Sequence, residues 1–334
     1  MKMRKIFCLL LCIIAVFASV TSCSPLSSTK EEKEIVMTVG EYDVPYELYY
    51  YLSENLKADM PDADKEAIEA EVFEMVKELY AVFTLGEEFG ISADDKYIES
   101  IADDAAKLAI EECGGKEEYK KTLAENHMND SVFRFLKKHR QIADEILSAI
   151  MDSEEYGMDA EGVKSLVMSE EFACVKQILV MGESSISSVD DTSFIAAEKH
   201  TDEEALAIAE KARAEAVAGA DFDALVNEYG ESLYMFNNTD GYYACHGMWD
   251  SVNEDAVFAL EVGEISEVIE SEKGYSVFLR CEKSEQYVED HVDTLAESYY
   301  NAVYNILLQE EIDSLTVKTN DVYEGYVNGV VTEK

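Results

Sequence analysis

The spacing of apolar residues changes once along this chain, and that change constrains the fold class. Between residues 64 and 150, apolar residues recur every three or four positions, which is the period of an amphipathic helix. Residues 172–181, FACVKQILVM, are instead one continuous apolar run that favours a buried strand. Helices followed by strands indicate an α+β protein with a helical part and a sheet-containing part.

The helical part is expected to span residues 35–150. A short strand at 35–39 comes first, and Pro45 suits the first turn of a helix over 46–56. A second helix over 64–89 should bury one apolar stripe, made of Ile68, Val72, Met75, Val76, Leu79 and Phe83. A third helix over 94–112 should bury Ile98, Ile101, Ala105, Leu108 and Ala109, and two more helices should follow.

The second part is expected to be a compact unit over 168–285 with a small antiparallel sheet. Its first strand covers 170–181, and paired strands close it. Thr201 and Glu204 form a capping box that opens a helix, and Asp221 caps a shorter helix. A last helix is expected over 287–315.

The N-terminus predicts export. A short basic segment precedes residues 6–20, which are apolar, uncharged and too short to span a bilayer comfortably. The letters VTSC follow and end at Cys23, which resembles the bacterial lipobox. That resemblance implies a signal peptide at 1–22, lipidation of Cys23 and a tether at 23–34 that anchors the protein outside the bacterial cell membrane. An ordinary signal peptide that contains a cysteine is the alternative.

Acidic residues outnumber basic residues by 71 to 27, and the formal net charge is −44. Such a chain repels phosphate, which excludes nucleic acid as a natural partner. Most of this charge is expected to form a solvated surface; attraction for basic unfolded polypeptides or metal ions is the alternative. The sequence lacks calcium-loop spacing, a C-x-x-C pair, a G-x-S-x-G elbow and a glycine-rich phosphate loop. It therefore predicts no metal site and no cofactor.

The second part carries the motifs of a known family in the right order. A-V-F-A-L-E-V-G-E-I-S at 256–266 closely resembles the aFaLkvGevS segment of parvulin-type (PpiC) prolyl isomerases. Residues 172–180, 219–229 and 274–280 resemble that family's opening strand, short helix and closing strand. The resemblance implies a parvulin-like domain at 168–285.

The helical part resembles the SurA/PrsA class of extracytoplasmic foldases in its layout. The shared features are the anchor, the strand–turn–helix, E-E-F-G-I-S at 87–92 and G-G-K-E-E-Y-K-K-T-L at 114–123. In that class an N-terminal helical chaperone module, completed by a C-terminal helix, carries an inserted parvulin domain. The resemblance thus implies that the helix at 287–315 packs on the helical module.

The catalytic positions that this resemblance implies are substituted. Family members usually carry histidines, facing each other across neighbouring strands, at the positions of Gln177 and Ser276. They often carry Asp or Cys at the nearest match to Ser232. Gln and Ser can form hydrogen bonds, but they cannot titrate near neutrality as histidine does. No residue is therefore assigned a catalytic role, and whether the chain is an isomerase stays open.

The proline pocket implied by the resemblance is also altered. The family lines it with a Met and two Phe. Phe258 matches the second Phe, Asn253 the first and Trp249 the Met, with Met248 adjacent. An Asn in this pocket adds a polar group that must be solvated or bonded. Trp249 is either an aromatic wall of a substrate-binding surface or part of the core.

Two cysteines fall on the first and last strands of the parvulin-like unit. Cys174 and Cys281 lie at odd offsets from Gln177 and Ser276, so they belong to the opposite face if the strands are regular. In an antiparallel pair of strands, the residue numbers of facing residues add up to a nearly constant sum. By this rule the two cysteines are expected to lie close together. A disulfide and two free buried thiols are both open.

Three functions are compatible with these observations. The substitutions favour a membrane-anchored foldase or chaperone that binds unfolded or nascent secreted proteins, with weak or lost peptidyl-prolyl cis-trans isomerase activity. An active parvulin-type isomerase is the alternative, and a non-enzymatic envelope binding lipoprotein is a more distant one. Contact with the membrane is expected through the lipid anchor only. Modules of this class can also form homodimers.

Overall fold

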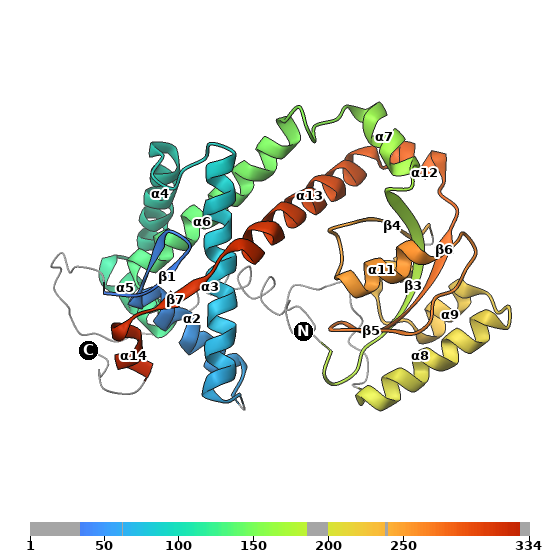
Figure 1. The fold of residues 1–334 in the computed structure, drawn as a ribbon, viewed down its shortest axis with the longest axis horizontal. Coiled ribbons are helices and arrows are strands. Elements are labelled where there is room, and N and C mark those ends of the chain that lie inside the picture. Colours follow the sequence, from blue (N-terminus) through green and yellow to red (C-terminus); the bar gives the residue numbers. More distant parts are fainter. Residues whose placement is uncertain (1–33, 62, 186–199, 238–239, 328–334) are drawn as a thin grey trace. The chain divides into compact units, whose positions relative to one another are not determined.

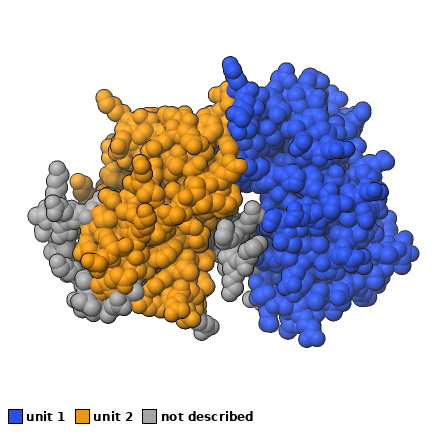
Figure 2. All heavy atoms as spheres, viewed as in Figure 1, with its two compact units in different colours: residues 1–16, 154–306 blue, residues 17–153, 307–334 orange. Residues whose placement is uncertain are grey.

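The computed structural model describes residues 34–61, 63–185, 200–237 and 240–327 (Figure 1). The expected signal peptide, the lipidation site at Cys23 and nearly all of the tether lie outside these residues. Within the described ranges, no helix is both long enough and apolar enough to cross a bilayer. The described residues fall into two compact units, 154–306 and 34–153 with 307–327, which Figure 2 colours separately.

The helical unit combines the two ends of the described chain. Its sheet has the order β2-β1-β7, with β1 (Ile35–Val39) antiparallel to both β2 (Tyr42–Pro45) and β7 (Val317–Thr319). Its helices are α2 (Tyr46–Asp59), α3 (Lys65–Glu88), α4 (Lys96–Glu112), α5 (Lys116–Glu125), α6 (Asp130–Asp152) and α14 (Asp321–Val327). Because β7 and α14 follow the second unit along the chain, the C-terminal segment completes a module that the N-terminal segment begins. The expected α+β class with an inserted sheet-containing part is confirmed.

Side-chain caps and apolar stripes explain where these helices lie. Asp64 accepts a hydrogen bond from the backbone N–H of Ala67 and starts α3, while Gly90, with φ +74°, follows its end. All six residues of the expected α3 stripe are buried. The face expected for α4 is partly wrong, because Leu108 is 56% exposed. α4 instead buries Ala102 and Ala106, whose small side chains let it approach α6.

The second unit is built on a four-stranded antiparallel sheet of order β4-β3-β6-β5. β3 (Phe172–Val180) lies between β4 (Tyr242–Cys245) and β6 (Gly274–Cys281), and β5 (Ile269–Ser271) pairs with the other edge of β6. The helices of this unit are α7 (Ala160–Met168), α8 (Asp202–Val217), α9 (Phe222–Tyr229), α10 (Leu233–Asn237), α11 (Ser251–Ala259), α12 (Glu285–Asp290) and most of α13 (Val292–Ser314).

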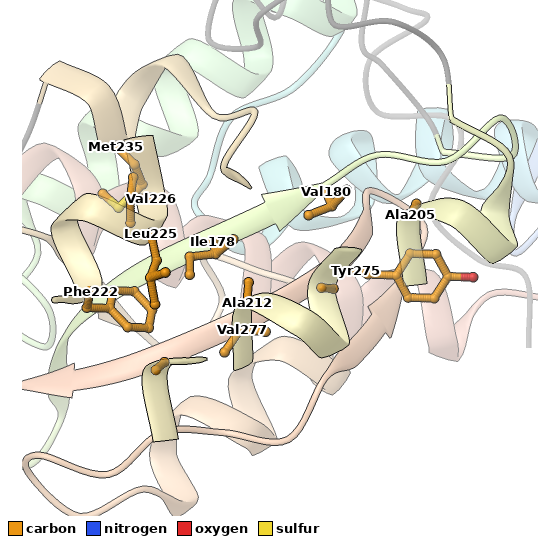
Figure 3. Close-up of a cluster of buried hydrophobic side chains, with 12 residues drawn as sticks. Ile178, Val180, Ala205, Ala212, Phe222, Leu225, Val226, Met235, Tyr275 and Val277 are labelled. Carbon is orange, nitrogen blue, oxygen red and sulfur yellow. The ribbon is translucent and has the colours of Figure 1, made fainter. Parts of the chain in front are cut away.

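Helices cover both faces of this sheet. On one face, Ile178, Val180 and Val277 pack against the buried alanines of α8 and against α9 (Figure 3). The capping box of Thr201 and Glu204 opens α8 as expected. On the opposite face, Val175 and Phe278 pack against Val257 of α11. The alternation of a regular strand thus separates two cores.

The helix expected over 287–315 is two helices. α12 starts after Ser284, whose side chain accepts a hydrogen bond from the N–H of Tyr287, and ends where His291 leaves the helical region with φ −124°. α13 follows and continues to Ser314. Leu295 and Ala302 of α13 are buried in a cluster with Phe172 of β3, within the parvulin-like unit. Only the last turns of α13, from Leu307, belong to the helical unit.

Candidate functional site

Gln177 and Ser276 contact each other across the two central strands. Nε2 of Gln177 donates a hydrogen bond of 2.9 Å to Oγ of Ser276. Ser276 is fully buried, whereas Gln177 is partly exposed. The two positions that carry histidines in the parvulin resemblance are therefore joined, but by a neutral amide and a hydroxyl. This pair can orient a peptide through hydrogen bonds and cannot exchange a proton near neutral pH.

The pair is diagonal in the sheet rather than directly opposed. Gln177 lies opposite Phe278, and Ser276 lies opposite Leu179. Gln177 and Ser276 thus face each other across neighbouring strands, two residues away from direct opposition. Diagonal neighbours on one face are within reach of a long side chain, and the length of Gln177 makes the contact.

Ser232 lies apart from this pair. It is buried, and its Oγ lies 3.3 Å from the hydroxyl of Tyr242, with either group able to donate. Tyr242 belongs to β4, next to β3, and its ring stacks on that of Tyr234 at a centroid distance of 4.1 Å. The three polar positions of the resemblance thus form two separate hydrogen-bonded pairs, with the second pair tied to an aromatic stack.

Trp249 forms the centre of an aromatic group on the same face of the sheet. Its ring stacks on Phe278 at 5.7 Å and meets Tyr242 edge-on at 5.5 Å. Trp249 and Tyr242 are partly exposed, while Phe278 is fully buried. Trp249 packs on the core and is only partly buried, and its role in a substrate-binding surface stays a prediction. We call Gln177, Tyr242, Trp249 and Phe278 the aromatic face.

Phe258 and Met248 occupy different surroundings. Phe258 packs against the cluster of Val257 and Phe278, beside Trp249. The imidazole of His246 stacks on the Phe258 ring at 4.0 Å, and the Arg280 guanidinium lies 5.9 Å from it. Met248 instead packs against the cluster of Phe172 and Cys174. The structure therefore brings Phe258 to Trp249 and separates Met248 from both.

Asn253 is a buried polar residue on α11. Its Nδ2 donates a 2.8 Å hydrogen bond to the Asp250 carboxylate, whose other oxygen accepts from the Asn253 backbone N–H. Asp250 thereby caps α11. Among the described residues, Oδ1 of Asn253 is buried without a hydrogen-bond partner. The residue at the expected pocket position is thus used to start the helix, and its remaining acceptor is unsatisfied.

Glu254 is a functional candidate that the sequence did not single out. Its carboxylate accepts hydrogen bonds from the backbone N–H groups of Gly247 and Trp249, at 2.8 and 2.9 Å, and lies 3.4 Å from Nδ1 of His246. Three contacts from one buried carboxylate fix the segment that presents Trp249. No local motif marks Glu254 among so many acidic residues, so the spacing alone could not have found it.

A second buried carboxylate, Glu231, holds the end of β3. Its Oε2 accepts a 2.6 Å hydrogen bond from the N–H of Met181, and its Oε1 lies 3.4 Å from Nε2 of His200. Burial raises the pKa of Glu231, which the bond from Met181 and the charge of His200 oppose. This group supports the strand that carries Gln177 and does not reach the aromatic face through any recorded bond.

Cys174 and Cys281 lie directly opposite each other on β3 and β6. Both are free thiols, as are Cys113 and Cys245 elsewhere in the described part of the chain. Cys174 is buried and Cys281 is partly exposed, on the sheet face opposite Gln177. Within the described ranges, no three His, Cys, Asp or Glu side chains are grouped so that they could hold a metal ion.

Comparison with known proteins identifies the family of one segment. Residues 187–282 match the family model described as "Rotamase: PPIC-type PPIASE domain". A comparison with curated proteins finds no match.

A comparison with solved structures finds matches that include three PrsA proteins. Peptidylprolyl isomerase PrsA from Bacillus anthracis is 18% identical over 72% of this chain and 96% of its own, with a TM-score of 0.34. Foldase protein PrsA from Streptococcus pneumoniae is 13% identical, over 83% of this chain and 95% of its own, with a TM-score of 0.33. PrsA from Bacillus subtilis is 16% identical, over 85% and 92%, with a TM-score of 0.28.

The match and the fold agree with the resemblance drawn from the sequence. The matched segment contains α8 to α11 and the strands β4, β5 and β6, and it lies between the two chain segments of a helical unit. Residues 187–282 are thus similar to the PpiC-type peptidyl-prolyl isomerase domain, and this segment stands between the two chain segments of the helical unit.

Proposed function

We propose that this protein is a lipid-anchored extracytoplasmic chaperone that binds unfolded secreted polypeptides, with weak or lost isomerase activity. The observation that carries the proposal is the hydrogen bond between Gln177 and Ser276. This bond joins the side chains at the two positions that hold histidines in the resemblance, and neither of these side chains titrates near neutrality.

The surroundings of Asn253 support the loss of proline binding. An unpaired buried acceptor costs about 1–3 kcal/mol unless a donor reaches it. Oδ1 of Asn253 is such an acceptor among the described residues, and a proline ring has no N–H to offer. A proline placed beside Asn253 would therefore leave this cost in place, whereas the Phe of the family would contribute apolar surface.

Retention of the helical unit supports the chaperone role. The α3 stripe is completely buried, and the C-terminal strand β7 pairs with β1 to close the small sheet. A chain that keeps this module while losing the polar groups of its isomerase domain is consistent with client binding as the main function.

The aromatic face favours the second candidate, an active isomerase. Isomerisation breaks no bond, and a partly exposed apolar surface that desolvates an Xaa-Pro amide can lower its barrier of about 18–20 kcal/mol. Trp249 and Tyr242, packed edge to face above the buried Phe278, keep such a surface. Measurable but slow isomerisation would fit this candidate better than the first.

Client binding is tested by aggregation suppression. The full chain is added in increasing ratio to a chemically unfolded secreted protein, and light scattering is recorded after dilution. We expect suppression by the native chain and equally by the Gln177→Ala variant. An acidic protein of similar net charge is the control for simple charge effects. Scattering no lower than with that control would overturn the chaperone proposal.

The anchor is a separate part of the proposal. Cys23→Ala removes the thiol that would carry the lipid, and one tether would supply all membrane affinity. We expect the variant to appear in the soluble extracytoplasmic fraction, whereas Cys113→Ala stays with the membrane. Fractionation of cells that express each variant measures this, and a Cys23→Ala protein that remains in the membrane would contradict the anchor.

A further inference from the structure

Cys174 on β3 and Cys281 on β6 lie directly opposite each other, and the hydrogen bonds of the two strands show which kind of antiparallel pair they form. On β3, the N–H of Gln177 donates to Sδ of Met235 and the carbonyl of Leu179 accepts from Glu231, so odd-numbered peptide groups point away from β6. The carbonyl of Phe172 accepts from the Arg280 side chain, so even-numbered groups point toward β6. The peptide groups of Cys174 therefore point toward its partner, Cys281.

The hydrogen bonds of β6 lead to the same conclusion about the pairing of the two cysteines. The carbonyl of Phe278 accepts from Ser266 at 2.9 Å, and the N–H of Arg280 donates to Glu264 at 3.0 Å. Peptide groups at even positions of β6 thus point away from β3, and those of Cys281 point toward it. Cys174 and Cys281 form a hydrogen-bonded antiparallel pair, for which the Cα atoms lie about 5.5 Å apart. Disulfides usually span about 4.4–6.8 Å between Cα atoms, which this pair meets. They also need Cβ atoms about 3.5–4.5 Å apart, whereas opposed strand residues lie about 4.5–5.5 Å apart, so the two strands must approach slightly for the bridge to close.

The two thiols differ in exposure and in chemistry. Cys174 is 1% exposed, while Cys281 is the partly exposed last residue of β6. The Cys174 thiol donates to the carbonyl of Asp240 at 3.3 Å, and the Cys281 thiol donates to the carbonyl of Leu279 at 3.5 Å. The neighbouring Cys174 side chain, and after it the positive charge of Lys176, lower the pKa of Cys281; burial and the charge of Asp223 oppose them. The neighbouring Cys281 side chain, followed by burial, raises the pKa of Cys174. A partly exposed thiol with enhanced thiolate character beside a buried thiol is the arrangement of an attacking and a resolving group.

We propose that Cys281 and Cys174 form a thiol–disulfide exchange site that takes low-molecular-weight disulfides such as oxidised glutathione. The Cys281 thiolate attacks one sulfur of the disulfide, forms a mixed disulfide and releases one thiol. Cys174 then loses its proton and attacks the Cys281 sulfur, which releases the second thiol. The two protein thiols are oxidised to a disulfide, and the small disulfide is reduced to two thiols, which leave.

The site has a direct consequence for the aromatic face. Cys174 precedes Gln177 on β3, and Cys281 follows Ser276 on β6, so the bridge ties together the two strands that carry the polar pair. Closing this pair should slow the opening of β3 from β6. The inference stands on the register and the two thiols, and it does not depend on the proposed function.

The test exposes the folded, fully reduced full chain to an excess of oxidised glutathione at neutral pH. Free thiols are then alkylated, and peptide mapping by mass spectrometry locates each cysteine. We expect one linked peptide pair that joins Cys174 to Cys281, with slower amide hydrogen exchange in β3 and β6. Cys245→Ser is the matched control, because Cys245 is also a buried strand cysteine, and it should react as the native chain does.

Two variants separate the roles of the thiols. Cys174→Ser should stop at a stable glutathione adduct on Cys281, since the resolving thiol is gone. Cys281→Ser should form neither the bridge nor an adduct on the buried Cys174. The proposal is overturned if the folded native chain keeps both thiols reduced at an oxidant concentration that cross-links the urea-unfolded chain. It is equally overturned if Cys245 or Cys113 reacts in place of Cys281. The mapping of the native chain decides the matter even if a variant fails to fold.

Discussion

At the scale of residues, Ser276 depends on Gln177 for the hydrogen bond that its buried hydroxyl receives. We predict that Gln177→Ala lowers the free energy of unfolding by about 1–3 kcal/mol, because it leaves a buried hydroxyl without this donor. Urea unfolding followed by far-UV circular dichroism measures the change.

The matched control for this prediction is Gln286→Ala. Gln286 makes a comparable 3.0 Å hydrogen bond to Asp290, but on an exposed helix surface. Its loss should change the unfolding free energy by no more than about 0.5 kcal/mol. Equal effects of the two substitutions would mean that the Gln177–Ser276 bond does not stabilise the sheet.

Glu78 of α3 should give the stability of the protein a pH dependence. Burial, and then the charges of Glu71 and Glu74, raise the pKa of Glu78 from 4.5 to about 8. Between these two values the folded state holds a proton that the unfolded chain has released. The free energy of unfolding must therefore fall as the pH rises through this window.

Glu78→Gln should remove this dependence. The variant has no proton to lose at this position. The free energy of unfolding that it gains over the native chain should therefore be larger at about pH 9 than at about pH 5, by on the order of a few kcal/mol. Urea midpoints at the two pH values measure the difference. Glu66→Gln, at an exposed position of the same helix, is the control. A gain for Glu78→Gln that does not change with pH would show that Glu78 is ionised in the fold at both values.

At the scale of elements, the sequence predicted best those helices that have both a cap and a strong apolar stripe. α3 follows Asp64 and buries its whole stripe, and α8 starts at the Thr201 capping box. α7 and α10 are short and were not predicted, because so few turns carry no clear period. The α4 face was misjudged because large side chains were taken as core, whereas close packing on α6 selects alanines.

For the candidate site, the sequence predicted the positions of residues better than their individual contacts. The resemblance predicted which residues stand at the parvulin positions, and the sheet brings Gln177 to Ser276 as a diagonal pair. It could not show that Ser232 bonds to Tyr242, that Asn253 bonds to Asp250 or that Met248 packs elsewhere. The contacts of Asn253 and Met248 depend on the path of the chain between β4 and α11, and that of Ser232 on the turn between α9 and α10, which periodicity does not predict.

The segment between β4 and α11 should depend on Glu254. We predict that Glu254→Ala shifts the emission of Trp249, the only tryptophan, to longer wavelength and increases its quenching by acrylamide. The reason is that the N–H groups of Gly247 and Trp249 lose their shared acceptor. Loss of bonds to a charged group should also cost about 1.5–3 kcal/mol of unfolding free energy.

Asp255→Ala is the control for this prediction. Asp255 is the next residue of α11 and is exposed, so both the spectrum and the stability should stay close to those of the native chain. An unchanged Trp249 spectrum in Glu254→Ala would show that other contacts hold the segment. Two such contacts are the bond from Asn305 to the Gly247 carbonyl and the packing of Met248.

At the scale of the whole molecule, the order of the chain segments was predictable and the membership of α13 was not. The helical part and the sheet-containing part follow from patterns along the sequence, and the return of the C-terminal segment follows from the resemblance. α13 is one long helix whose residues belong to both units, and its sequence pattern alone does not mark the change at Ile306. Buried Leu295 and Ala302 pack with β3, which only tertiary contacts reveal.

The central claim is that this foldase-like chain retains little isomerase activity because its polar site consists of Gln177 and Ser276. The most direct measurement is the rate of cis-to-trans exchange in a series of Xaa-Pro peptides, recorded with the full chain and with the Gln177→His, Ser276→His double variant. We predict that the native chain leaves the rate close to the uncatalysed value for every Xaa, while it still suppresses client aggregation. Acceleration by the native chain equal to that of an intact parvulin would contradict the account and make the protein an active prolyl isomerase.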